Sequence, residues 1–319
     1  MTNVHHPLKT SGRILEFSGE VPRVHDPVLA KEGNTYYLFS TGPGITVHTS
    51  RDMQSWERQD SVFTQPVPWA AETISGSRFH YWAPDIFFLN NRWHLYYSVS
   101  TFGRNHSAIG LATSPALSEC HWRDEGVAII SSPEDDWNAI DSNLALDETN
   151  QLWMAIGSFW SGIKLLRLDS STGKPAKDAA LISIASRPLS EGIHGSIEGA
   201  SIIRRGKFYY LFVSFDFCCR GILSTYNIRI GRSSSITGPY LDRDGRAMND
   251  GGGSLLLSGS GRWIGPGHNS IYSEDGTDWL IYHAYDAEDS GLSKLRIEEL
   301  LWDGGAWPYA SSMPPILSQ

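Results

Sequence analysis

The sequence feature that most constrains the fold is a unit that recurs five times along the chain. Each unit contains a run of aromatic and β-branched residues bounded by Gly, Asn, Asp or Ser, which is typical of a short strand. These runs occupy residues 35–40, 93–99, 152–157, 208–214 and 279–283. A polar residue in an apolar setting precedes each run, and the five are Asp26, Asp85, Asp141, Glu198 and His268. Their separations of 59, 56, 57 and 70 residues set the length of the unit.

Further strand-like segments complete the units. Runs such as 45–49, 109–113 and 229–232 follow the aromatic strand, and short Trp-containing runs such as 55–58 and 121–124 come last. Four short strands in a unit of this length are typical of a β-propeller blade. We therefore predict an all-β fold, a five-bladed β-propeller with about four antiparallel strands per blade, as a single domain over residues 1–319. A β-sandwich would not predict a polar residue at the same point of every unit, and a β-helix would have a much shorter period.

The charge balance and the cysteines limit the partners and the location. The formal net charge is -9, and nucleic-acid binding needs a basic face, so we expect no nucleic-acid partner. The sequence has no apolar run long enough to span a membrane, and residues 1–10 lack the apolar run of a secretion signal. Three cysteines, Cys120, Cys218 and Cys219, do not form a disulfide framework. We therefore expect a cytoplasmic protein with reduced thiols and a neutral substrate such as a sugar.

The five polar residues predict a reactive site. The innermost strand of each blade lines the channel of a propeller, so polar residues at the start of these strands should meet at one end of it. Buried carboxylates cost free energy unless they are paired or hydrogen-bonded, and such clusters often mark a functional site. The sequence has no phosphate-binding loop, metalloprotease motif or nucleophile elbow. Glycoside hydrolysis by a pair of carboxylates is the chemistry that suits the remaining residues.

Several motifs carry a resemblance to a known family. HDP begins at His25, WAPD at Trp82, NAID at Asn138, GSFWSG at Gly157 and DFCCRG at Asp216. In this order they resemble the endo-α-1,5-L-arabinanases of glycoside hydrolase family 43, over nearly the whole chain. The resemblance implies an inverting hydrolase on a five-bladed propeller that cleaves the α-1,5-linked arabinofuranose backbone of arabinan or arabino-oligosaccharides.

The resemblance also implies roles for individual residues. Asp26 would be the general base, Glu198 the general acid, and Asp141 would raise the pKa of Glu198 and orient it. His268 would lie near a central metal ion, calcium, although calcium prefers oxygen ligands and would need waters to complete its shell. Asp85 is expected to have a structural role. The expected sugar contacts are Gly103, Asn138, Ala139, Ile140, Ser158, Phe159 and Trp160, with Trp82 and Phe102 as stacking platforms.

Other readings remain open at this point. Ala200 stands where the family commonly has a proline shortly after the acid, and residues 189–195 match no familiar segment. Exo cleavage, by an arabinofuranosidase or β-xylosidase of the same family, is therefore an alternative to endo cleavage. A sugar-binding propeller without catalysis is a third interpretation. The presence of all three carboxylates, Asp26, Asp141 and Glu198, argues against it. We expect His25 and His283 to be surface or packing histidines.

Overall fold

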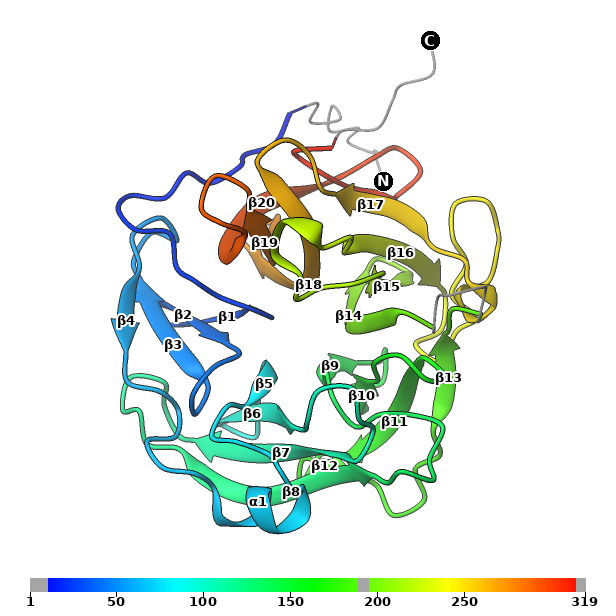
Figure 1. The fold of residues 1–319 in the computed structure, drawn as a ribbon. Coiled ribbons are helices and arrows are strands. Elements are labelled where there is room, and N and C mark those ends of the chain that lie inside the picture. The colour runs from blue at the N-terminus through cyan, green and yellow to red at the C-terminus, as the bar shows by residue number, and fades with distance from the viewer. Residues whose placement is uncertain (1–10, 189–194, 314–319) are drawn as a thin grey trace.

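Five antiparallel sheets are arranged in a ring (Figure 1). The computed structural model describes residues 11–188 and 195–313. The predicted all-β, five-bladed propeller is confirmed, and the innermost strands β1, β5, β9, β14 and β18 lie closest to the centre of Figure 1. Over the described ranges, no helix combines the length and the apolar character that a membrane-spanning helix needs.

Four of the five blades have four strands in chain order. The first contains β1 (Val28–Glu32), β2 (Thr35–Ser40), β3 (Thr46–Ser50) and β4 (Glu57–Gln59). The second contains β5 (Trp82–Leu89), β6 (Arg92–Val99), β7 (Ser107–Ser114) and β8 (Arg123–Ser131). The fourth contains β14 (Ile197–Arg205), β15 (Phe208–Phe215), β16 (Asn227–Ser233) and β17 (Ser254–Ser258). The fifth contains β18 (Trp263–Glu274), β19 (Thr277–Asp286), β20 (Leu292–Trp302) and β21 (Pro308–Ala310).

The third blade has a split outer edge. Its strands are β9 (Asn143–Leu146), β10 (Leu152–Ile156), β11 (Ile163–Asp169), β12 (Lys174–Pro175) and β13 (Ile182–Ala185), and both β12 and β13 pair with β11. Three short helices lie in connections: α1 (Pro68–Thr73), η1 (Gly221–Leu223) and η2 (Met248–Asp250). The aromatic run predicted in each unit is the second strand of its blade.

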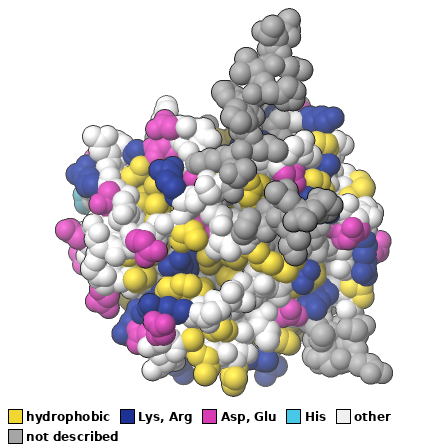
Figure 2. Space-filling model, turned by 90° about the horizontal axis from the view of Figure 1, so that it is seen from above, with side chains coloured by type: hydrophobic (Ala, Val, Ile, Leu, Met, Phe, Trp, Pro, Cys, Tyr) yellow, Lys and Arg dark blue, Asp and Glu magenta, His cyan; other side chains and the backbone are white. Residues whose placement is uncertain are grey.

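The hydrophobic core is divided among the junctions between blades. Each of five buried clusters joins residues of two neighbouring blades, as Tyr96 of the second blade and Met154 of the third do. Leu38 and Ile281 belong to the cluster that joins the first blade to the fifth and closes the ring. Burying one large apolar side chain contributes about 1.5–3 kcal/mol, so these junctions hold the blades in a fixed arrangement. On the outer face shown in Figure 2, acidic and basic side chains are interspersed.

Each innermost strand has a residue of positive φ either within it or two residues before it. The five are Asp26 at 53°, Ala83 at 43°, Asp141 at 59°, Gly199 at 59° and His268 at 46°. In the second, fourth and fifth blades the pairing register shifts beside this residue, as at a β-bulge. The spacing of the polar residues predicts Asp85 and Glu198 at this repeat position, and this prediction is wrong. Asp85 stands two residues after the repeat position, and Glu198 stands one residue before it.

A hydrogen bond links most of these residues to the previous blade. The backbone N–H of each donates to a polar side chain at the end of the neighbouring second strand. The bonds run from Ala83 to Thr41 (2.8 Å), from Asp141 to Ser98 (3.1 Å), from His268 to Ser214 (2.7 Å) and from Asp26 to His283 (3.2 Å). Gly157 occupies the corresponding place in the third blade and has no side chain. There the N–H of Gly199 donates to Asp141 Oδ2 instead, at 3.3 Å.

Candidate active site

The candidate site lies on the side of the ring where the innermost strands begin. Antiparallel pairing brings the start of each first strand beside the end of each second strand. Four of the polar residues are linked there, because His268 Nδ1 lies 3.1 Å from Asp26 Oδ1 and the charges of Asp26 and Glu198 both act on Asp141. The structure thus brings together Asp26, Asp141, Glu198 and His268.

Asp26 is a buried carboxylate held by hydrogen-bond donors. His25 Nδ1 lies 2.8 Å from Oδ1, and the Thr41 hydroxyl donates to Oδ2 at 2.5 Å. Burial opposes the ionised form, but His25 and His268 outweigh it, so the pKa of Asp26 lies well below its ordinary value. An ionised carboxylate of this kind can accept a proton from water.

Glu198 lies at the start of β14, with each carboxyl oxygen in a separate hydrogen bond. Ser158 Oγ donates to Oε2 at 2.6 Å, and the Tyr226 hydroxyl donates to Oε1 at 2.6 Å. The side chain is partly exposed, whereas Tyr226 is buried. Two donors from different loops therefore fix the direction of this carboxyl while leaving it accessible.

Asp141 is the third carboxylate, and its surroundings are opposite to those of Asp26. Burial and the charge of Glu198 raise the pKa of Asp141 well above its ordinary value. The 3.3 Å bond from the Gly199 N–H to Oδ2 ties it to the residue that follows Glu198. A carboxyl in this position can influence both the orientation and the electrostatics of Glu198.

Asp85 is engaged at a blade junction. Its Oδ2 accepts the N–H of Leu144 at 2.7 Å, which connects β5 to β9 of the next blade. Burial raises the pKa of Asp85 to about 7. These contacts agree with the structural role expected for this residue.

The residues expected to contact sugar fall into two groups. Phe102 and Trp160 are exposed, at 81% and 40%, on the loops after β6 and β10, and Gly103 is exposed beside Phe102. Trp82 and Phe159 are partly exposed. The buried group contains Asn138, Ala139, Ile140 and Ser158. Residues 189–194, including Glu191, lie outside the described residues.

Several site residues were missed by the sequence analysis. His25 and His283 contact Asp26 and are not merely surface or packing residues. The HDP motif places His25 next to Asp26, and an alignment of the repeats places Thr41 with Ser98 at the end of its strand. Tyr226 follows a long loop, and nothing in the sequence pattern pointed to it.

The residues around His268 fit calcium poorly. Calcium takes six to eight oxygen ligands, whereas His268 offers imidazole nitrogens, and its Nδ1 lies beside Asp26. In the described part of the chain, two groups of three His, Cys or Asp/Glu side chains have ligand atoms within 4.8 Å of one another: His25 with Asp26 and His283, and His25 with Cys218 and Cys219. His268 is in neither group. An oxygen shell would have to come from water, and we derive no chemical step from calcium.

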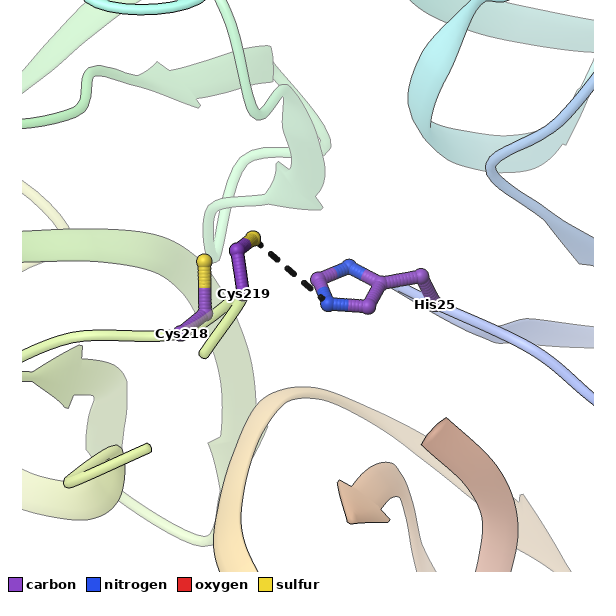
Figure 3. Close-up of side chains that lie close together, drawn as sticks. All are labelled: His25, Cys218 and Cys219. Carbon is purple, nitrogen blue, oxygen red and sulfur yellow. Dashed lines mark hydrogen bonds between the residues drawn. The ribbon is translucent and has the colours of Figure 1, made fainter. Parts of the chain in front are cut away.

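The second of these groups lies beside Asp26, because His25 contacts both Asp26 and Cys219. Cys218 and Cys219 follow β15, and Cys219 Sγ points toward the His25 ring at 3.8 Å from Nε2 (Figure 3). The hydrogen bond between the two thiols, with a contribution from His25, lowers the pKa of Cys219 to about 6. The same bond and burial raise the pKa of Cys218.

Comparison with known proteins agrees with this arrangement. The family model described as glycosyl hydrolases family 43 matches residues 22–308. The chain belongs to glycosyl hydrolase family 43. The match includes Asp26, Asp141, Glu198 and His268.

Relatives within family 43 include both modes of cleavage. The chain is 48% identical over 296 residues to the extracellular exo-α-(1→5)-L-arabinofuranosidase ArbA of Cellvibrio japonicus, covering 89% of this chain and 85% of the relative. It is 46% identical over 289 residues to the extracellular endo-α-(1→5)-L-arabinanase 1 of Bacillus subtilis, covering 89% and 87%. The solved α-L-arabinanase of Cellvibrio cellulosa in complex with arabinohexaose has a TM-score of 0.87 and 46% identity, covering 91% of this chain and 96% of that one.

Proposed function

We propose that this family 43 protein is an inverting glycoside hydrolase that cleaves α-1,5-L-arabinofuranosidic linkages in arabinan, with endo action. The observation that supports this proposal most is that two different carboxylates lie in one site. Glu198 is accessible and accepts two hydrogen bonds, whereas Asp26 is buried and is kept ionised by histidines. The names of the relatives support arabinan as the substrate.

The proposed reaction assigns one proton transfer to each carboxyl. Asp26 accepts a proton from a water molecule, which attacks the anomeric carbon from the side opposite the leaving group. Glu198 donates a proton to the glycosidic oxygen as its bond to the anomeric carbon breaks. The product therefore has inverted configuration, as expected for an acid and a base acting on opposite faces of the sugar. Asp141 orients Glu198 through its bond to Gly199.

Endo action is the finer part of the proposal. Exposed aromatic side chains at Phe102 and Trp160 come from the second and third blades, so they can contact sugars at separate positions along a chain. Exo action is the alternative, because a relative with an exo name is about as similar as one with an endo name.

Replacement of Glu198 by Gln tests the proposed acid. The amide keeps the shape but has no acidic proton to transfer to the leaving oxygen, so turnover of linear arabinan should fall by roughly 10²–10⁴-fold. An arabinoside with a good leaving group needs less acid assistance and should lose much less rate. Exposed Glu119 provides the matched control Glu119→Gln, which should keep wild-type rates. Equal losses on both substrates, or none, would contradict the role of Glu198.

The sizes of early products test the mode of cleavage. Endo action releases a mixture of oligosaccharides from linear arabinan before arabinose accumulates, and it lowers viscosity rapidly. Release of arabinose alone, or of one oligomer length, from the first time points would replace endo with exo action while leaving the hydrolase assignment intact.

Calcium near His268 remains a separate proposal. If calcium acts there, a chelator should lower activity, added calcium should restore it, and His268→Ala should no longer respond to either. Equal chelator response in wild type and variant would remove His268 from the metal proposal.

The cytoplasmic location remains a prediction, and fractionation of the source cells would test it.

A further inference from the structure

A cluster of metal-ligating side chains lies beside the proposed base and has no part in the proposed reaction. His25 Nε2 and the sulfurs of Cys218 and Cys219 lie within 4.8 Å of one another (Figure 3). Zinc–sulfur and zinc–nitrogen bonds in a tetrahedral site place the two ligand atoms about 3.6 Å apart. The 3.8 Å between Cys219 Sγ and His25 Nε2 is already close to this separation.

The other nitrogen of His25 is hydrogen-bonded to the carboxylate of Asp26. Nδ1 lies 2.8 Å from Asp26 Oδ1, so the ring can donate its Nδ1 proton to this carboxylate and present Nε2 to a metal. Histidine ligands of zinc commonly donate their second N–H to a carboxylate, which fixes the ring and raises its basicity. Tyr285 OH lies 2.8 Å from Nε2, and a metal ion bound to Nε2 would replace this one hydrogen bond.

The local backbone holds the cysteines in place and leaves them accessible. The Cys219 N–H donates to Tyr285 OH at 2.6 Å, and the next N–H, that of Arg220, donates to Ser224 Oγ at 3.1 Å. Cys219 is exposed, and Cys218 and His25 are partly exposed. Two sulfurs and one imidazole nitrogen favour zinc or cadmium over calcium or magnesium. Three protein ligands leave a fourth position for water.

We propose that His25, Cys218 and Cys219 form a binding site for a thiophilic divalent cation such as zinc, distinct from any calcium near His268. A second consequence rests on the proposed function. A cation on Nε2 makes Asp26 the partner of a metal-bound imidazole and weakens it as an acceptor of the water proton. Occupancy of this site should therefore inhibit hydrolysis.

Cadmium titration of the reduced full-length protein tests the binding itself. Cadmium–thiolate bonds give an ultraviolet charge-transfer band, and wild type should show it with one tightly bound ion per chain. The double variant Cys218→Ser/Cys219→Ser should lose the band and at least tenfold in affinity. Cys120→Ser, at an exposed cysteine of the second blade, is the control and should bind like wild type. His25→Gln should keep the band and lose roughly 10-fold or more in affinity.

The outcomes separate this proposal from the proposed function. A wild type without the band, or a double variant that binds as tightly as wild type, would overturn the site. In the activity measurement, each protein is compared with its own metal-free rate. Zinc should inhibit wild type and Cys120→Ser at least tenfold more strongly than the double variant, and equal inhibition would overturn the regulatory part. Binding in a protein that does not hydrolyse arabinan would refute the proposed function and leave the metal site standing.

Discussion

Asp26 and Asp141 occupy the same position in two blades but have opposite surroundings. Both stand at the start of an innermost strand with positive φ, at 53° and 59°, and both are buried. Burial disfavours ionisation of each. At Asp26, the histidines outweigh the effect of burial, and the pKa of Asp26 is lowered. At Asp141, the charge of Glu198 adds to the effect of burial, and the pKa of Asp141 is raised.

The comparison shows that the repeat supplies the position and the neighbours supply the chemistry. The backbone brings a carboxyl to the site in the first and third blades by the same local geometry. His25 and His268 lower the pKa of Asp26, whereas burial and the charge of Glu198 raise that of Asp141, so the neighbouring groups separate the two pKa values.

Asp26→Asn should have the largest effect in this comparison. The amide keeps the size of the side chain but cannot accept the water proton, so kcat on linear arabinan should fall by about 10³–10⁴-fold. Affinity for arabino-oligosaccharides, measured by calorimetry, should stay within a few fold. A variant that keeps more than a tenth of the wild-type kcat would show that Asp26 is not the base.

Asp141→Asn should have a smaller effect on kcat, about 10–10²-fold. Asn can still accept the N–H of Gly199 through its amide oxygen, so the position of Glu198 should be largely kept. What is lost is the charge interaction with Glu198, so the pH dependence of kcat should change shape as well as height. An unchanged profile, or a loss as large as that of Asp26→Asn, would remove the proposed difference between the two residues.

The sequence was sufficient for the architecture because the aromatic second strand recurs in every blade. The site was only partly predictable. The shifts in strand register changed the alignment, so Glu198 and Asp85 do not stand at the repeat position that the sequence analysis gave them. Tyr226 reaches Glu198 from a loop after β15, a contact between distant residues that no short-range pattern encodes.

Substitution of Thr41 tests how the hydrogen bonds between neighbouring blades support Asp26, the proposed base. Its hydroxyl donates to Asp26 Oδ2 and accepts the N–H of Ala83, so Thr41→Val removes both bonds. Loss of one hydrogen bond to a charged group costs about 1.5–3 kcal/mol, and we expect kcat to fall by about tenfold. Thr41→Ser should restore it. Ser98→Ala breaks the corresponding bond to the N–H of Asp141 and should lower stability with a smaller change in kcat.

If kcat falls by a similar factor in Thr41→Val and Ser98→Ala, the hydrogen bonds between blades affect kcat only by making the fold rigid, and Thr41 has no separate effect on Asp26. Thermal unfolding of both variants provides the comparison, because each change removes a hydrogen bond to a backbone N–H at a blade junction. A selective loss of kcat in Thr41→Val at equal stability would assign Thr41 as a positioning residue for Asp26.

Substitution of Asp286 should change the stability of the fold and leave the roles proposed for Asp26 and Asp141 unchanged. It is fully buried, and Arg262 and Lys294 donate to it at 2.6 and 2.8 Å. Bonds from Arg262, against the opposing effect of burial, hold its pKa well below the ordinary value. Its ionised form therefore stabilises the fold above the unfolded pKa of about 3.9, and this contribution is lost as pH falls toward the folded pKa. Asp286→Asn should lower the free energy of unfolding by about 1.5–3 kcal/mol at pH 7, the usual contribution of a hydrogen bond to a charged group, and urea titrations should show this difference shrinking below about pH 4. A difference that stays constant down to about pH 3 would show that packing, and not charge pairing, accounts for the role of Asp286.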